Sequence, residues 1–420
     1  MLILASPLDI FNIGYMTEKT KTLLFVILLI FAVFSSFLIA KTAAKYNFDN
    51  SLSLLAGQFI KGHISMEPNR ELPLGDIAIY GGKFYLYFGP LPSVILTPFA
   101  ALFGKHFPQI LIGIFSMYAS FYAAYSISKS FKFKRVDSLW LALFFVFSTV
   151  LFSASLINIT AYQVEVLGTA FLLLALAEYF SKKRPLLIGL LLGLAVLTRF
   201  TLILAVIFFI IEFLQKRLSK RQFILFLIPL FLCCSIFGAY NYARFHSFLE
   251  TGYNHTIPTP FPLSKNAEYG LTSPIHIPAN LYSFLIMPPE PILYYSKGFV
   301  LKFPYLKASP WGMAIWFTSP LFFLLLFQFK KNKYTLAAAV TVLALAIPAF
   351  TYFSVGFAQF GYRYALDFLP FLFLLLLPCL EPGGRPKLSR TAIALITIGI
   401  LFNCIYITSL WGVYPLFGIN

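Results

Sequence analysis

Residues 185–214, "PLLIGLLLGLAVLTRFTLILAVIFFIIEFL", form one long apolar run with Arg199 at its middle. Roughly 20 apolar residues are enough for a helix to cross a bilayer. The run is therefore either one steep helix with a buried charge or two short helices that turn at Thr198–Arg199. Clusters of Lys and Arg flank it at 182–184 and 216–221. If both clusters face the cytoplasm, as the positive-inside rule favours, the chain must form a hairpin, which also moves Arg199 away from mid-bilayer.

The composition places the whole chain in a membrane. Of its 420 residues 59% are hydrophobic and 11% are charged, and the mean hydropathy is +0.82. This is more apolar surface than a soluble core needs, so the sequence predicts an all-α polytopic membrane protein forming one integral domain over residues 1–420. The net charge of +17 fits basic cytoplasmic loops and anionic lipids rather than nucleic acid, because no basic stripe carries a readable motif.

The positive-inside rule also sets the course of the chain. Five basic clusters fall between apolar segments, and all five face the cytoplasm if the chain crosses the membrane eleven times. The first apolar run is longer than a signal-peptide core and is expected to be an uncleaved helix, with Met1 or Met16 as the start. The expected spans are 22–40, 107–128, 138–156, 160–180, the 185–214 hairpin, 222–243, 309–329, 334–353, 364–380 and 391–411.

A second apolar stretch, "YGGKFYLYFGPLPSVILTPFAALFG" at 80–104, resembles a span but contains three prolines. Only one net crossing fits between the first helix and the basic cluster at 129–135, and 107–128 is the better candidate because it has no internal proline. Counting 88–104 as a span would invert every later loop. We therefore expect juxtamembrane helices here, with this stretch as one wall of an outer site.

Two long segments then face outward, the first extracytoplasmic loop at 41–106 and a second at 244–308. Together they hold all five histidines and seven of the fifteen acids. Chemistry is therefore expected on the extracytoplasmic side, with the amino end in the cytoplasm and the carboxyl end outside. No HExxH, paired-histidine or DxD pattern is present, so the sequence indicates no certain cofactor and leaves a divalent metal open.

The first outer loop contains two candidate groups. Asp49 follows the first span, where it can cap the helix that starts near Ser51 or act as a general base at the membrane surface. Lys83, Tyr85 and Tyr87 alternate as in a short extended segment. The lysine can reach lipid headgroups or neutralise a phosphate.

Five segments together resemble the GT-C membrane glycosyltransferases, in particular the family 39-like bacterial relatives of protein O-mannosyltransferases and lipid A aminoarabinose transferases. The segments are "YNFDNS", "YGGKFYLYFGPLPSVILTPFAALFG", "LLLGLAVLTRFTLIL", "YNYARFHSFLETGY" and "FGYRYALDFLPFL". Their order over most of the chain makes the combination more specific than any one of them. The resemblance implies a GT-C-like fold with about eleven transmembrane helices.

The resemblance also implies a polyprenyl-phosphate-sugar-dependent hexosyl- or pentosyltransferase that inverts the anomeric centre at the outer face. Asp49 would be the base. Asn50 stands where several relatives have a second acid, which weakens a paired-carboxylate or metal-assisted mechanism. A polyprenyl phosphate is already a good leaving group, so the enzyme needs a base and cations. The expected substrate-binding residues are Lys83, Arg199 and Arg363, followed by Tyr85, Tyr87, Asp76, Glu165, Arg244 and Asp367.

Several of these residues have a simpler interpretation. Arg363 can pair with Asp367 four residues on, and Arg244 can anchor the outer end of the seventh span. A transporter or flippase of lipid-linked sugars is the main alternative function, and a non-catalytic assembly protein with a transferase-like fold is another. In each case we expect a multi-pass protein of the bacterial plasma (inner) membrane. Its expected partners are a polyprenyl-phosphate-linked sugar and membrane lipids, and the acceptor stays unidentified.

Overall fold

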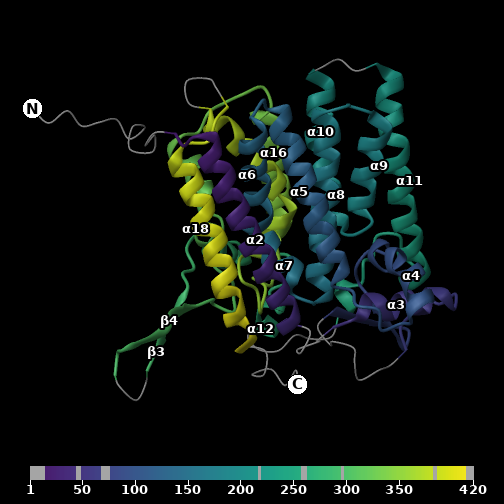
Figure 1. The fold of residues 1–420 in the computed structure, drawn as a ribbon. Helices are drawn as coiled ribbons and strands as arrows, with labels where there is room; N and C mark the ends of the chain where they lie inside the picture. The colour runs from purple at the N-terminus through teal and green to yellow at the C-terminus, as the bar shows by residue number, and fades with distance from the viewer. Residues whose placement is uncertain are drawn as a thin grey trace, which may run out of the picture.

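The computed structural model describes residues 15–43, 49–67, 76–215, 219–256, 263–294, 298–381 and 386–412. Outside these residues lie the possible start Met1, one of the seven acids of the outer segments (Glu71), and parts of the basic clusters at 216–221 and 385–390. Helices dominate the described chain, and its strands form two short hairpins (Figure 1). The predicted class, an all-α polytopic membrane protein, is confirmed.

Within the described residues, five helices are long and apolar enough to cross a membrane. They are α2 (Glu18–Ala43), α5 (Leu111–Ser130), α8 (Thr160–Phe180), α11 (Lys220–Phe245) and α18 (Arg390–Tyr406). The helices α6 (Arg135–Phe147) and α7 (Val150–Leu156) form a sixth candidate, bent by 55°. Two of these helices start with serine caps inside basic clusters, since Ser219 and Ser389 each accept a backbone N–H of the first turn.

Shorter helices occupy the other predicted spans. The run at 185–214 breaks at Thr198–Arg199 as predicted, where one α-helix has ended at Val196 and a 3-10 helix leads into the next (Figure 1). The number of eleven crossings stays a prediction, because these segments are shorter than the usual span. They are α9 (Pro185–Val196), the 3-10 helix η3 (Phe200–Ala205) with α10 (Val206–Gln215), α14 (Ile315–Thr318), η7 (Pro320–Phe323), α15 (Leu324–Phe327), α16 (Thr335–Thr351), η8 (Arg363–Asp367), α17 (Leu369–Leu376), η9 (Leu377–Leu380) and η11 (Ile407–Gly412).

The first outer segment forms a small layer at one end of the bundle. It contains α3 (Ser51–Ile60), the antiparallel hairpin of β1 (Ile77–Tyr80) and β2 (Lys83–Leu86), and α4 (Leu91–Phe103) (Figure 1). Gly81 and Gly82 make the two-residue turn, and both have positive φ, which this turn requires. With 13 residues, α4 is too short for an ordinary span.

The second outer segment is less compact. It contains η4 (Tyr253–His255), α12 (Leu263–Ala267), η5 (Pro274–His276), α13 (Ile277–Leu285) and the antiparallel pair β3 (Glu290–Leu293) and β4 (Leu301–Lys307). This last hairpin projects from the bundle (Figure 1).

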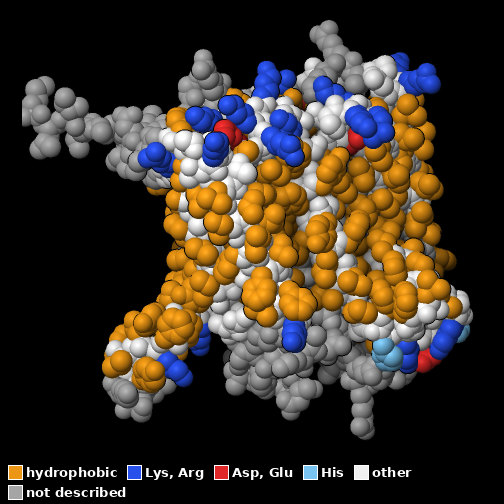
Figure 2. Space-filling model, in the orientation of Figure 1, with side chains coloured by type: hydrophobic (Ala, Val, Ile, Leu, Met, Phe, Trp, Pro, Cys, Tyr) orange, Lys and Arg blue, Asp and Glu red, His pale blue; other side chains and the backbone are white. Residues whose placement is uncertain are grey.

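The surface and the core match a bilayer environment. Figure 2 shows a broad apolar belt around the middle, with Lys and Arg gathered at the end where α10 approaches α11. The most apolar window of α2 is 22% buried and that of α11 is 28% buried, so both present apolar side chains outward. By contrast, the window of α8 is 94% buried, so α8 is the central helix and any charge on it must find a partner inside the protein.

Two of the helices are joined by a sealed ion pair. Lys21 Nζ in the first turn of α2 donates to Asp137 Oδ1 in the first turn of α6 at 2.5 Å, and both side chains are 0% exposed. Trp140 Nε1 donates to the Lys21 carbonyl at 3.1 Å. Because these contacts fix both helix starts, their role is structural.

Candidate functional site

Four buried charges meet at the end of α8 that carries Glu165. Arg199, which precedes η3, donates to Asp367 Oδ1 at 2.9 Å and lies 3.4 Å from Glu165 Oε1. Arg363, the first residue of η8, donates to the same Glu165 oxygen. The two carboxylates are 2–3% exposed, whereas the two guanidinium side chains are 12% and 13% exposed. Residues far apart in sequence thus form one network in which positive and negative charges balance.

This network is not fully satisfied by the protein. Oε2 of Glu165 and Nε of Arg363 are buried and have no hydrogen-bond partner among the described residues. A buried polar atom without a partner costs free energy, and a role in ligand binding or catalysis is one explanation for such an atom in a native protein. One acceptor and one donor are therefore available to a ligand.

The predicted alternative for Arg363, an ion pair with Asp367, is wrong. Arg363 pairs with Glu165, and Asp367 instead accepts from Arg199 and from Thr201 Oγ1 at 3.2 Å. The reason is local geometry, because residues 363–367 form a 3-10 helix rather than an α-helix. With 3.0 residues per turn, positions four apart do not share a face.

Tyrosines surround the charges. The Arg363 guanidinium lies over the rings of Tyr364 and Tyr162, with centroid distances of 4.4 and 4.9 Å. It also donates to the Tyr364 hydroxyl at 3.0 Å. Three further tyrosine rings continue this lining. The ring centroid of Tyr352 lies 5.6 Å from that of Tyr364 and 6.1 Å from that of Tyr253. The Tyr253 and Tyr87 centroids are 4.3 Å apart. The site is therefore both aromatic and polar.

Asp76 closes the site from the first outer segment. Its Oδ1 accepts a hydrogen bond from the Tyr87 hydroxyl at 2.7 Å, and its side chain is half-buried. Burial, followed by the nearby charge of Asp49, raises the pKa of the Asp76 carboxyl to about 6. The Tyr87 hydrogen bond and the charge of Arg363 act in the opposite direction. Asp76 thus titrates near neutral pH beside the arginine network.

Asp49, the predicted base, has the contacts of a helix cap. One carboxylate oxygen accepts from the Ser51 N–H at 2.8 Å, and the other accepts from the Thr160 N–H at 2.6 Å, at the starts of α3 and α8. The Ser51 hydroxyl donates to the first oxygen as well. Asp49 is 3% exposed. The neighbouring Asn50 accepts from the Gln109 N–H at 3.1 Å, so it too joins two segments.

The remaining predicted residues divide into two groups. Lys83 is exposed at the turn of the β1–β2 hairpin, apart from the four charges, and Tyr85 packs edge-on against Phe245. Arg244 is buried and donates to the carbonyls of Leu86 and Phe88, while its guanidinium lies 4.0 Å from the Tyr240 ring centroid. It thus fixes the end of β2 against α11, which fits the simpler interpretation as an anchor.

The proline-containing stretch holds the Arg199 turn in place. The N–H groups of Gly89 and Leu91 donate to the carbonyls of Thr198 and Leu197 at 3.1 and 3.3 Å. A Cβ on Gly89 would lie 2.0 Å from the Leu197 oxygen, so only glycine permits this approach. The stretch at 80–104 therefore supports the site through its backbone.

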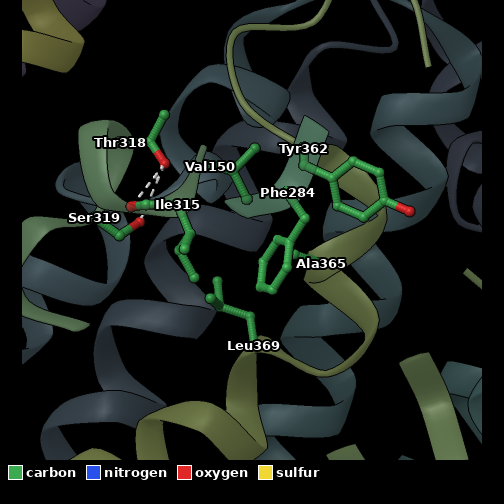
Figure 3. Close-up of a pocket in the computed structure, with 8 residues that line it drawn as sticks. All are labelled: Val150, Phe284, Ile315, Thr318, Ser319, Tyr362, Ala365 and Leu369. Atoms are coloured by element: carbon green, nitrogen blue, oxygen red, sulfur yellow. Dashed lines mark hydrogen bonds between the residues drawn. The ribbon is translucent and has the colours of Figure 1, made fainter. Parts of the chain in front are cut away.

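A small cavity is lined in part by residues in and next to η8, and it is distinct from the charged site. Figure 3 shows it between the Phe284 ring and the side chains of Val150, Ile315 and Leu369, with the Tyr362 hydroxyl pointing away. That hydroxyl is hydrogen-bonded to Asn280 and Ala349 instead. The cavity is lined by apolar groups and two short hydroxyl side chains, so we assign it to packing.

The described residues contain no cluster of three or more His, Cys, Asp or Glu side chains that could hold a metal ion. Asp49 and Asp76 are close enough to interact electrostatically, but the oxygens of Asp49 are taken by N–H and O–H donors. The chemistry available is that of two arginines, carboxylates and tyrosine hydroxyls.

The fold and site define a multi-pass α-helical membrane protein with a buried ionic and aromatic site at one end of its bundle. No family model matches the sequence, and no curated protein is similar to it. Among solved structures, the chain is similar to the crystal structure of ArnT from Cupriavidus metallidurans in the apo state, with 13% identity and a TM-score of 0.46. The match covers 87% of this chain and 60% of that chain. The function of this protein must therefore be inferred from the residues of its own site.

Sequence reasoning missed four tyrosines of the site, one of which, Tyr162, lies three residues before Glu165. Tyr253 and Tyr364 lie within the motifs "YNYARFHSFLETGY" and "FGYRYALDFLPFL", beside the charged residues that drew attention. Tyr352 is at the end of α16 and has no neighbouring signal. An aromatic residue at the outer end of a span is ordinary in membrane proteins, so only the fold identifies it.

Proposed function

We propose that this protein is a membrane glycosyltransferase of the GT-C type that transfers a sugar from a polyprenyl-phosphate donor to a cell-envelope acceptor, with inversion, at the extracytoplasmic face. The observation that carries the proposal is the buried network of Arg199, Arg363, Glu165 and Asp367, with tyrosines and Asp76 around it. It lies at a helix end, where a lipid phosphate at the bilayer surface can reach it.

The two arginines would bind the phosphate that departs. Each guanidinium is partly exposed and already oriented by carboxylates, and Nε of Arg363 is free to donate. Donors fixed in advance stabilise developing negative charge more than mobile ones do. Part of the phosphate interaction would replace contacts to Glu165, which would then be free to accept a hydrogen bond from a sugar hydroxyl through its second oxygen.

The tyrosines would hold the sugar. Rings of Tyr87, Tyr253, Tyr352 and Tyr364 follow one another from the first outer segment to η8. Such rings offer apolar faces together with hydroxyl groups, a combination found in sites for small polar ligands. A single displacement with inversion also needs a base on the side of the sugar opposite the phosphate. The sequence assigns this role to Asp49.

The direct test is release of polyprenyl phosphate by the purified protein in lipid nanodiscs, with a panel of decaprenyl-phosphate-linked hexoses and pentoses. We expect turnover of at least one donor, and loss of about 10²–10³-fold in Arg363→Gln, the range seen when one transition-state donor is removed. Arg184→Gln is the matched control, because Arg184 pairs with Glu178 at 2.9 Å outside the site. If no donor turns over, and the protein instead moves these lipids between the leaflets of vesicles, it is a transporter.

The orientation of the protein is tested separately by cysteine labelling at Lys132 and Ser264. Cys233, Cys379 and Cys404 are buried, and the half-buried Cys234 is first replaced by Ala. We expect position 264 to react with an impermeant reagent from outside and position 132 to react after the membrane is opened. Labelling of both from one side would contradict the proposed topology.

A further inference from the structure

Two acids of the first outer segment, Asp49 and Asp76, interact electrostatically, and Asp76 is also within electrostatic reach of Arg363, but their surroundings differ. Both carboxylate oxygens of Asp49 accept hydrogen bonds. Two of the three donors are backbone N–H groups at the first residues of α3 and α8, and the third is the Ser51 hydroxyl. Asp49 is also only 3% exposed, so its carboxylate is closed off from an incoming acceptor.

Asp76 has the opposite surroundings. Its side chain is half-buried rather than sealed, and one of its oxygens accepts from the Tyr87 hydroxyl at 2.7 Å. Tyr87 in turn packs against Tyr253 in the lining of the site. The acid is thus oriented by the Tyr87 hydroxyl, the backbone N–H of Ala161 also stabilises its charged form, and its side chain is less buried than that of Asp49.

We propose that Asp76, rather than Asp49, is the general base that deprotonates the acceptor, and that Tyr87 positions it. The inference rests on the proposed glycosyltransferase function. In the reaction, the acceptor hydroxyl gives its proton to Asp76 and its oxygen bonds to the anomeric carbon. The bond from that carbon to the phosphate oxygen breaks, and its electron pair leaves with the polyprenyl phosphate bound by Arg199 and Arg363.

The charged and titratable groups around Asp76 determine when it acts. Burial raises the pKa of Asp76 most and Asp49 raises it further, whereas the Tyr87 hydrogen bond, the charge of Arg363 and the Ala161 N–H lower it. Tyr253 and Tyr352 also lie within electrostatic reach of Asp76. With a pKa of about 6 the carboxylate is ionised at neutral pH and still basic enough to accept a proton, which is the compromise a general base needs. Turnover should therefore rise as the pH passes through about 6 and level off above it.

The test is the pH dependence of donor turnover in three variants. Asp76→Asn should lose about 10²–10⁴-fold in turnover, the contribution of a positioned base, while still binding decaprenyl phosphate. Tyr87→Phe removes a hydrogen bond that favours the charged carboxylate, so the acidic limb should move to higher pH. Asp49→Asn removes a neighbouring negative charge, so the same limb should move to lower pH. Tyr80→Phe, in the same hairpin, is the matched control and should leave the limb in place.

Two results would overturn the inference. One is turnover by Asp76→Asn with an unchanged acidic limb. The other is a folded Asp49→Asn protein that loses turnover completely while Asp76→Asn keeps it. If Asp49→Asn does not fold, Asp76→Asn and Tyr87→Phe decide alone. Absence of turnover of every donor by the native protein would overturn the proposed function itself, and the inference with it.

Discussion

Two of the sets of buried charges in the molecule differ in kind, and they lie at opposite ends of the bent pair α6–α7. Near its start, Lys21 and Asp137 are both 0% exposed and make a single ion pair that joins two helices. Beyond its end, at the start of α8, Arg199 and Arg363 are 12–13% exposed, share the Glu165 carboxylate and leave buried polar atoms unpaired. Both sets satisfy the rule that charges in an apolar environment need partners. Among the described residues, both sets leave buried polar atoms unpaired, Oδ2 of Asp137 in the first and Oε2 of Glu165 and Nε of Arg363 in the second. The cations of the second set are partly exposed and those of the first are not, so we expect the first set to act on stability and the second on turnover.

The largest effect on stability should come from Lys21→Met, which leaves the Asp137 carboxylate buried and unpaired. Breaking a buried pair in this way costs about 3–5 kcal/mol. Thermal unfolding in detergent, followed by intrinsic fluorescence, measures the loss. Lys19→Met is the control, because Lys19 is exposed on the same helix. The double variant Lys21→Met/Asp137→Leu should recover most of the stability, and no loss in the single variant would contradict a sealed structural pair.

Gly89→Ala should affect the functional end through the backbone. The new Cβ would lie 2.0 Å from the Leu197 carbonyl oxygen, so the turn that positions Arg199 must move. A displacement of about 1 Å at a reacting site can cost about 10²-fold in rate. Donor turnover measures the effect. Gly238→Ala is the comparison, since its nearest new contact is an ordinary 3.6 Å. Unchanged turnover in Gly89→Ala would separate this stretch from the site.

The sequence predicted where helices break better than it predicted the partners within the site. Basic clusters and prolines are local signals. They correctly predicted the break at Thr198–Arg199 and that the proline-containing stretch would not form a helix of ordinary spanning length. The partners of Arg199 lie at positions 165 and 367, and no local pattern relates them. Where a local rule was used, in the four-residue spacing of Arg363 and Asp367, it failed because the tertiary fold winds that segment as a 3-10 helix.

Asp49 should affect stability less than the sealed pair does. Removal of its carboxylate in Asp49→Ala leaves N–H groups at the starts of α3 and α8 without an acceptor. Loss of a helix cap costs about 0.5–2 kcal/mol. The unfolding midpoint in detergent should fall accordingly, and Asp49→Asn, which keeps one acceptor oxygen, should fall less. Equal stability of the native protein and Asp49→Ala would show that these hydrogen bonds do not act as caps.

Lys83 should have the smallest effect, because it is exposed at a hairpin turn and lies apart from the four charges. A lysine near an anionic membrane surface contributes about 1 kcal/mol of attraction. Lys83→Gln should therefore raise the KM for the lipid donor roughly fivefold and leave kcat and the unfolding midpoint unchanged. Lys61→Gln is the control, since Lys61 is also exposed and pairs with Glu67. A much larger loss confined to kcat would mean that Lys83 reaches the departing phosphate during turnover, and that the β1–β2 hairpin closes over the arginine network when the donor binds.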